Sequence, residues 1–445
     1  MSTYQEVMPS MIAKAGAGRR RAMIAAVIGN TLEWYDFVVY AFLAGTIAKL
    51  FFPAGNDTAS LLLTLATFGV GFVMRPFGAV VLGSLADRAG RKSALLITIL
   101  LMGLGTAMIG FAPTYATAGW VAPLVIVTAR LIQGFSAGGE LGSATSFMME
   151  NSSPDRRGLG ASWQQASQAA TLVVGSLVGA AVTGLMPVQD LEAWGWRVPF
   201  FIGLLIVPIG LYIRSQVEES AEFAELGTAR EHSPLKQVLA SQSRQLIAGL
   251  GLVIVWTVCT YFFLIYMPTY ATRQLGLAQS ASLISNSVGL LVLMVLAPVF
   301  GHLSDRVGRK PLLLGAAAAI AILAYPLIAA LTHAPSIGTL VVVQSGMAVL
   351  IAAFAGPAPA ALGELYPTNV RSTGMSLAYN GAVTIFGGFA PFIATWLIAK
   401  TGNNLAPAFY VVASALASLI ALLFMRETAF MTTISSRSNS IYAST

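Results

Sequence analysis

The chain has 445 residues, of which 56% are hydrophobic and 10% are charged, and its mean hydropathy is +0.76. A soluble protein carries about a quarter charged residues, so this composition excludes an ordinary soluble domain. The apolar runs lack the strict alternation of a transmembrane barrel. The net charge of +7 follows from basic residues between those runs and does not indicate a nucleic-acid partner.

Twelve apolar runs organise the chain. They lie near residues 24–48, 60–84, 93–112, 121–149, 161–185, 197–214, 246–270, 281–303, 312–332, 338–364, 373–398 and 405–426. Each run can cross the hydrocarbon core of a bilayer as a helix, which needs about 20 residues and satisfies its own backbone. The expected fold is therefore an all-α membrane protein with twelve transmembrane helices in two pseudo-symmetric six-helix halves.

Polar stretches divide these runs into segments. We expect an N-terminal segment (1–22), a first half (23–214), a linker (215–245), a second half (246–426) and a C-terminal tail (427–445). The first apolar run is too long for the core of a signal peptide and contains two carboxylates, so we interpret it as an uncleaved first helix. The single cysteine, Cys259, excludes an intramolecular disulfide.

A doubled motif supports the division into halves. The stretch GSLADRAGRK (83–92) returns as GHLSDRVGRK (301–310), and each copy lies between two apolar runs. Glu150, Arg157 and Gly160 also follow the fourth run with the spacing that Glu364, Arg371 and Gly374 have after the tenth. A long internal period of this kind indicates the structural repeat of many transporter folds.

The distribution of Lys and Arg predicts the orientation. With the N-terminus in the cytoplasm and the loops assigned alternately, 19 of the 25 basic residues fall inside and four fall outside, namely Lys49, Arg197, Arg273 and Lys400. The remaining two, Arg75 and Arg130, lie within helices. Because cytoplasmic loops carry the excess of positive charge, both termini are expected in the cytoplasm.

The doubled motif resembles the signature of the major facilitator superfamily, and the resemblance covers nearly the whole chain. Five further stretches are similar to its metabolite:proton symporter branch. They are GNTLEWYDF (29–37), MRPFG (74–78), RLIQGFSAGGE (130–140), WGWRVPF (194–200) and EESAEF (218–223). Within that branch, SWQQASQ (162–168) is similar to carriers of citrate and tricarballylate.

The resemblance implies a secondary transporter of the bacterial inner membrane. Such a carrier would import a small organic acid together with protons by alternating access, and citrate or another di- or tricarboxylate is our first expectation. Other substrates of the branch (2-oxoglutarate, shikimate, betaine or proline) stay open. An exporter or exchanger and a non-transporting membrane sensor are further alternatives.

Three carboxylates are candidates for carrying the coupled proton: Glu33, Asp36 and Glu140. Ionisable groups inside membrane helices are costly, at about 2.5–3.5 kcal/mol near the helix centre on insertion scales, so they indicate function. Burial favours a neutral carboxyl group and a nearby arginine favours the charged one, and this competition suits proton coupling. The alternative is that these charges only pair with arginines to hold helices together.

Arg75 and Arg130 are candidates for holding a substrate carboxylate, since the planar guanidinium makes two parallel hydrogen bonds. Structural pairing with Asp36 or Glu140 is the alternative for each. Gln164, Ser167, Gln168 and Thr171 recur at helical spacing and form one polar stripe, which should face protein or water. The complete set of substrate-binding candidates is Asn30, Tyr40, Arg75, Arg130, Gln133, Gln164, Ser167, Gln168 and Asn380.

Charged residues at the predicted cytoplasmic helix ends are candidates for gating contacts, because carboxylates favour helix N-termini and cations favour C-termini. They are Asp87, Arg88, Arg91, Asp305, Arg306, Arg309, Glu150, Arg157, Glu364 and Arg371.

No enzyme motif competes with this interpretation. The sequence has no G-x-x-x-x-G-K-[ST] phosphate loop, and its three histidines lack metal-ligand spacing. We therefore expect no catalytic activity, cofactor or metal, and no nucleotide or nucleic-acid partner. The expected partners are a small organic anion, protons and the lipid bilayer.

Overall fold

The computed structural model describes residues 34–429 except 90, 151, 216–233 and 369. Glu33 and Asn30, much of the expected linker, and the N-terminal segment lie outside the described residues. The helices that contain Asp87, Arg88, Arg91 and Glu140 are described, but these four side chains are not.

The described part of the first half is helical. It comprises a helix at Trp34–Phe42, α2 (Ala44–Phe51), α3 (Asp57–Val73), α4 (Arg75–Ala89), α5 (Arg91–Gly110), α6 (Tyr115–Ala118), α7 (Val121–Ser136), η1 (Ala137–Gly139), α8 (Glu140–Glu150), η2 (Pro154–Arg156), α9 (Arg157–Leu185), α10 (Val188–Ala193), η3 (Gly195–Arg197) and α11 (Val198–Ser215).

The second half repeats this pattern. It comprises α13 (Pro234–Ser241), α14 (Ser243–Cys259), the π-helix η4 (Thr260–Tyr266), α15 (Met267–Leu275), α16 (Gln279–Val307), α17 (Arg309–His333), α18 (Ile337–Ala355), α19 (Ala358–Glu364), α20 (Arg371–Ala382), the π-helix η5 (Val383–Gly387), α21 (Ala390–Thr401) and α22 (Ala406–Phe424).

These helices form the expected twelve spans. Within the described residues, nine helices are long and apolar enough to cross a membrane, and a tenth span is bent by 72° between Trp34–Phe42 and Ala44–Phe51. The shorter apolar helices Leu96–Gly110 and Val121–Ser136 bring the number to twelve. The predicted fold class is confirmed.

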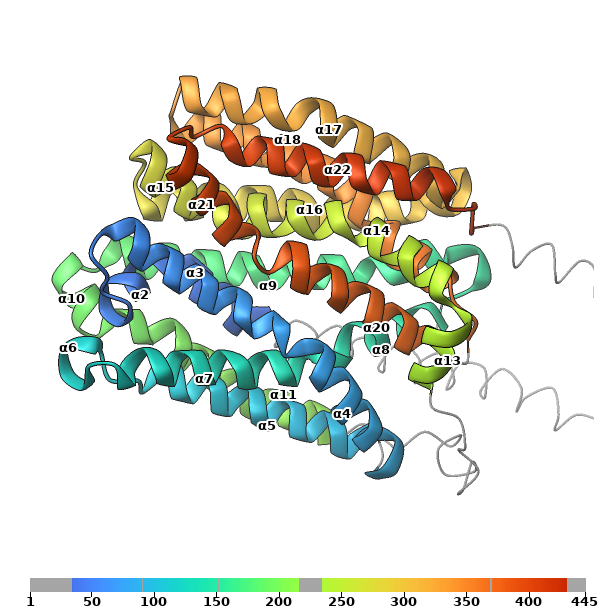
Figure 1. The fold of residues 1–445 in the computed structure, drawn as a ribbon, viewed down its shortest axis with the longest axis horizontal. Helices are drawn as coiled ribbons and strands as arrows, with labels where there is room; N and C mark the ends of the chain where they lie inside the picture. The colour runs from blue at the N-terminus through green and yellow to red at the C-terminus, as the bar shows by residue number, and fades with distance from the viewer. Residues whose placement is uncertain (1–33, 90, 151, 216–233, 369, 430–445) are drawn as a thin grey trace, which may run out of the picture.

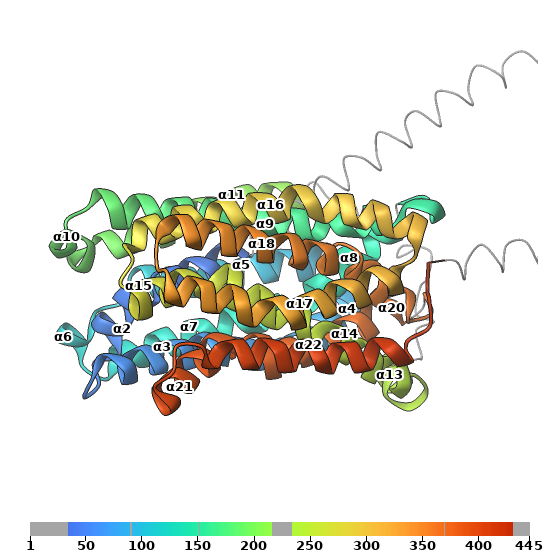
Figure 2. The same cartoon turned by 90° about the horizontal axis from the view of Figure 1, so that it is seen from above.

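The spans run side by side along the long axis of the molecule (Figure 1). The connecting helices α6 and α10 lie at one end, called here the α10 end, and α13 lies at the other, called the α13 end (Figures 1 and 2). Many large apolar side chains on the outer faces are exposed, including Val80, Leu177, Val295 and Ile322. Such a surface suits contact with lipid.

The two halves pack most extensively where α9 of the first half lies along α16 of the second. Two glycines make this approach possible. A Cβ at Gly301 would lie 2.5 Å from Ser162 Oγ and 2.7 Å from the Gly158 carbonyl oxygen. A Cβ at Gly158 would lie 2.5 Å from the Gly301 carbonyl oxygen. Small residues bring membrane helices into backbone contact in this way.

Candidate functional site

Two buried arginines lie among aromatic rings in the first half. The guanidinium carbon of Arg75, at the start of α4, is 4.4 Å from the ring centre of Phe72 and 4.9 Å from that of Phe37. The guanidinium carbon of Arg130, on α7, is 4.4 Å from Phe37 and 4.7 Å from Tyr40. Phe37 therefore faces both cations. Arg75 is 3% exposed and Arg130 is fully buried.

We call the rings around these two cations the aromatic box. Its members are Trp34, Phe37, Tyr40, Phe68, Phe72 and Tyr261. Ring faces carry partial negative charge and attract a guanidinium group by about 0.5–2 kcal/mol per contact. This attraction offsets only part of the cost of removing two cations from water.

The guanidinium groups keep unused hydrogen-bond donors. Arg75 Nε and the Nε and Nη2 atoms of Arg130 are buried without a hydrogen-bond partner. Among the carboxylates whose side chains the structure describes, none forms an ion pair with either arginine. The side chains of Glu33 and Glu140 are not among those described. Buried donors are normally paired, so these atoms are suited to receive an anion.

Asp36 connects to Arg130 through two neutral side chains. Thr106 of α5 donates a hydrogen bond to Asp36 Oδ2, and Gln133 Nε2 donates to Thr106 Oγ1 at 3.1 Å. Arg130 Nη1 donates to Gln133 Oε1 at 3.0 Å. We call this chain of four residues the polar relay. The direct pairing of Asp36 with Arg75 or Arg130, which the sequence left open, is not formed.

The second oxygen of Asp36 faces α11. Asp36 is 3% exposed, and its Oδ1 has no hydrogen-bond partner. A Cβ added at Gly203 would overlap with this oxygen. The Asp36 carboxylate therefore fits against α11 because Gly203 has no side chain.

The polar stripe on α9 is buried inside the protein and does not face lipid. Gln165 lies beside it and donates to Gln164 Oε1 and, at 3.2 Å, to Gln168 Oε1. Trp256 Nε1 on α14 donates to Gln165 Oε1 at 3.2 Å and thus joins the two halves. Ser167 donates to the Gln164 carbonyl oxygen of its own helix at 2.8 Å.

Asn380 and Tyr40 lie in different settings. Asn380 Nδ2 donates to the Gly138 carbonyl oxygen at 2.7 Å, across the boundary between the halves. The amide nitrogen of Asn380 is therefore already hydrogen-bonded to the first half. The Tyr40 hydroxyl donates to the Thr64 carbonyl oxygen at 3.1 Å, so its ring rather than its hydroxyl faces Arg130.

Charged groups connect the halves at the α13 end. Asp305 of α16 accepts hydrogen bonds from the backbone nitrogens of Gly158 and Leu159 at 2.8 and 3.0 Å. Arg309 forms ion pairs with Asp305 at 2.7 Å and with Glu364 at 3.2 Å. These two pairs are almost fully buried.

A third ion pair at this end, unlike the two pairs of Arg309, crosses between the halves. Glu150 and Arg371 lie 3.7 Å apart, although the sequence repeat pairs Glu150 with Arg157 and Glu364 with Arg371. Arg306 is exposed. Among the described side chains, no ion pair involves Arg157 or Arg306.

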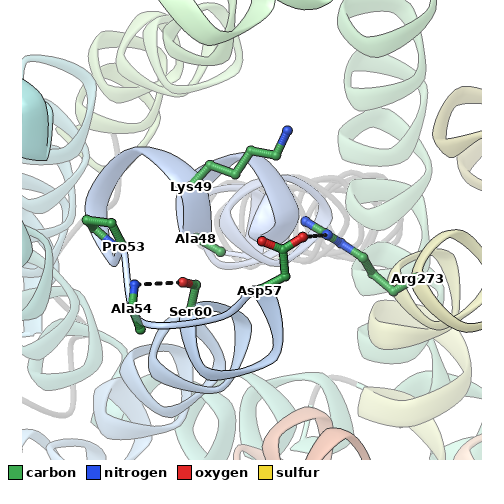
Figure 3. Close-up of a pocket in the computed structure, with 7 residues that line it drawn as sticks. All are labelled: Ala48, Lys49, Pro53, Ala54, Asp57, Ser60 and Arg273. Atoms are coloured by element: carbon green, nitrogen blue, oxygen red, sulfur yellow. Dashed lines mark hydrogen bonds and ion pairs between the residues drawn. The ribbon is translucent and has the colours of Figure 1, made fainter.

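The halves also meet at the α10 end, beside a pocket of about 220 Å³ (Figure 3). Arg273 of α15 pairs with Asp57 of α3 at 3.6 Å and donates to the Gly45 carbonyl oxygen at 3.3 Å. The pocket lining is Ala48, Lys49, Pro53, Ala54, Asp57, Ser60 and Arg273. Sequence patterns did not indicate this contact.

Several residues of the site were missed from the sequence: Thr106, Gln165, Trp256, Gly203 and Tyr261. Each is neutral, so the rarity of charge inside an apolar run does not single it out. Gln165 directly follows the candidate Gln164, and this position one residue from the stripe was the available signal.

The protein has two halves of six spans each, with buried charges between aromatic rings and polar contacts across the boundary. This is the architecture of a secondary transporter. The sequence profile described as "Major Facilitator Superfamily" matches residues 22–323, and that described as "Sugar (and other) transporter" matches residues 215–437. The chain belongs to the major facilitator superfamily, as its motifs indicated, and is not an enzyme.

Relatives and solved structures extend this result. The chain is 37% identical to the citrate-proton symporter of Klebsiella pneumoniae over 93% of its length and 94% of the relative. It is 34% identical to the proline/betaine transporter of Escherichia coli K12, over 92% of its length and 84% of the relative. The xylose transporter XylE of E. coli, in a partially occluded inward-open structure, matches with a TM-score of 0.75 at 20% identity, covering 92% of this chain and 98% of that one.

Proposed function

We propose that the protein is a proton-coupled symporter that imports citrate or a closely related di- or tricarboxylate. The observation that carries the proposal is the pair of buried guanidinium groups with unpartnered nitrogens in the aromatic box. A carboxylate would satisfy these donors with charge-assisted, two-pronged hydrogen bonds. The relatives named as citrate-proton symporters support the same substrate class.

The aromatic box also bears on the alternative substrates. Aromatic rings can bind a quaternary ammonium group such as that of betaine. Here, however, Phe37, Tyr40 and Phe72 already face guanidinium groups, so a cationic group would meet like charge. The anion is therefore favoured over betaine or proline, although relatives with those names are 34–35% identical to the chain.

Asp36 is the proposed carrier of the coupled proton. Its Oδ1 is buried without a partner, and its Oδ2 is joined to Arg130 by the polar relay. An anion that engages Arg130 would weaken the attraction of that cation for the Asp36 carboxylate and so favour its protonation. Substrate and proton would then occupy the protein together.

Transport would follow from rocking of the halves around this site. We propose that contacts of Asp305, Glu150 and Asn380 hold the α13 end closed, and that Arg273 and Asp57 do the same at the α10 end. The distribution of basic residues supports a cytoplasmic position for the α13 end and both termini, in the inner membrane of a bacterium. A membrane potential of 100 mV would add about 2.3 kcal/mol per charge moved.

The test is uptake of labelled citrate into proteoliposomes with and without an inward proton gradient, with internal pH recorded. We expect gradient-stimulated accumulation with proton entry, inhibited by unlabelled tricarballylate and not by betaine. Accumulation of betaine or proline instead would overturn the substrate class. Counterflow without proton entry would indicate an exchanger, and binding without flux would indicate a sensor.

A further inference from the structure

Tyr261 is the member of the aromatic box that comes from the second half. It lies on the π-helix η4 and is 1% exposed. Its ring centre is 5.2 Å from that of Phe72, 6.2 Å from Phe68 and 6.4 Å from Trp34, all in the first half. A π-helical turn changes the direction in which a side chain points, and such turns are frequent at functional sites.

The Tyr261 hydroxyl is buried without a hydrogen-bond partner. Two tyrosines nearby on the same span do have partners within the second half. Tyr266 bonds with Thr395 Oγ1 at 2.7 Å, and Tyr270 donates to the Asn404 carbonyl oxygen at 2.9 Å. A buried hydroxyl without a partner costs about 1–3 kcal/mol. Such a group in a native protein requires an explanation.

Tyr261 and Arg75 share two ring neighbours. Phe72 lies 4.4 Å from the Arg75 guanidinium carbon and 5.2 Å from the Tyr261 ring centre. Trp34 lies 5.4 Å and 6.4 Å from the same two groups. Arg75 Nε is also buried without a partner. Two unused donors from opposite halves thus lie in one box.

We infer that the Tyr261 hydroxyl donates a hydrogen bond to the organic anion that Arg75 holds. Tyr261 then determines specificity for the carboxylate from the second half, while the arginines act from the first. A carboxylate has enough lone pairs to accept from both donors. Binding would join the two halves through the substrate. This inference rests on the proposed function.

The test uses Tyr261→Phe, which removes the hydroxyl and keeps the ring. Citrate binding is measured on the purified full chain by calorimetry and by the rise in Tm that citrate produces. A hydrogen bond to a charged group is worth about 1.5–3 kcal/mol, so Kd should rise about ten- to hundredfold. The Tm without citrate should not fall, because the lost hydroxyl had no partner in the protein.

Tyr266→Phe is the matched control. It removes a bonded hydroxyl from the same π-helix, so it should lower Tm and leave citrate affinity unchanged. In an Arg75→Lys background, Tyr261→Phe should cost less affinity than in the wild type, because both residues act on one anion.

An unchanged Kd in Tyr261→Phe, with normal citrate binding by the wild type, would overturn the role of Tyr261 and leave the proposed function standing. Equal losses of affinity in Tyr261→Phe and Tyr266→Phe would also overturn it. Failure of the wild type to bind citrate, tricarballylate or 2-oxoglutarate would overturn both the proposed function and this inference.

Discussion

The carboxylate of Asp305 lies 2.8 Å from the backbone nitrogen of Gly158, at the first turn of the facing helix α9. The second copy of the doubled motif therefore caps a helix of the opposite half. Acidic groups are favoured at helix N-termini, where amide groups lack partners within the helix. At the α13 end the halves are thus joined by a carboxylate on backbone amides, in addition to the Glu150–Arg371 ion pair.

Loss of the Asp305 charge should open the α13 end. Asp305→Asn weakens both the helix cap and the pair with Arg309, so closure becomes less favourable. The thiol introduced by Ser146→Cys, at a buried position facing Met375 of α20, should then react several-fold faster with a maleimide. The native Cys259 is buried and gives little background.

Arg306→Gln serves as the control for that experiment, because Arg306 is exposed and has no ion pair among the described side chains. It should leave the labelling rate unchanged. Equal rates in the wild type and Asp305→Asn would show that this contact does not hold the end closed.

Glu427 should stabilise the protein in a pH-dependent way. Its carboxylate accepts hydrogen bonds from the backbone nitrogens of Arg309 and Lys310, at 2.8 and 3.0 Å, and from those of Thr428 and Ala429. Burial raises the pKa of Glu427, but these backbone donors outweigh burial and hold its pKa below the usual range.

A carboxyl group whose pKa is lower in the folded state stabilises the protein at a pH above its unfolded-state pKa, which is about 4.3 for Glu. That stabilisation is lost as the pH falls through the folded-state pKa. Glu427→Gln should therefore lower Tm at pH 7, and the difference from the wild type should shrink below about pH 4.3. Tm measured from pH 7 to pH 3.5 tests this. A difference that does not change with pH would contradict the role of the charge.

Gly203→Ala should displace Asp36, because the added Cβ would overlap with Asp36 Oδ1. We expect a lower Tm and loss of proton-driven uptake. Gly315→Ala is the control, since a Cβ there meets nothing within 4 Å. That substitution should raise stability by up to about 1 kcal/mol, the helix preference for alanine. Similar behaviour of the two variants would argue against close packing at Asp36.

Thr106→Val should break the polar relay while keeping the shape of the side chain. It leaves Asp36 Oδ2 and Gln133 Nε2 without their partner, at a cost of about 1–3 kcal/mol for each buried group. The ratio of protons to substrate, from parallel pH and tracer measurements, should fall. Thr106→Ser retains the hydroxyl and should preserve that ratio. If the ratio falls in both variants, the effect comes from altered packing and not from loss of the polar relay.

The fold was predictable because its main cause is the burial of apolar surface in lipid. The long apolar runs needed for that burial can be recognised directly in the sequence. Asp36, Arg75 and Arg130 could be predicted as candidates because charge inside an apolar run is rare, and the structure places all three in buried positions. Tyr261 and Thr106 could not, because the rotation of packed helices decides which neutral polar group faces the site. The pairing of Glu150 with Arg371 depends on how the two halves meet, which no local pattern specifies.

The most direct test of the central claim compares wild type and Asp36→Asn in two assays with the same proteoliposomes. Asparagine cannot bind or release the coupled proton but resembles the protonated acid in shape. Asp36→Asn should therefore retain citrate counterflow and lose accumulation driven by a proton gradient. If Asp36→Asn accumulates citrate to the wild-type level in response to that gradient, Asp36 is not the proton carrier and the proposed coupling is wrong.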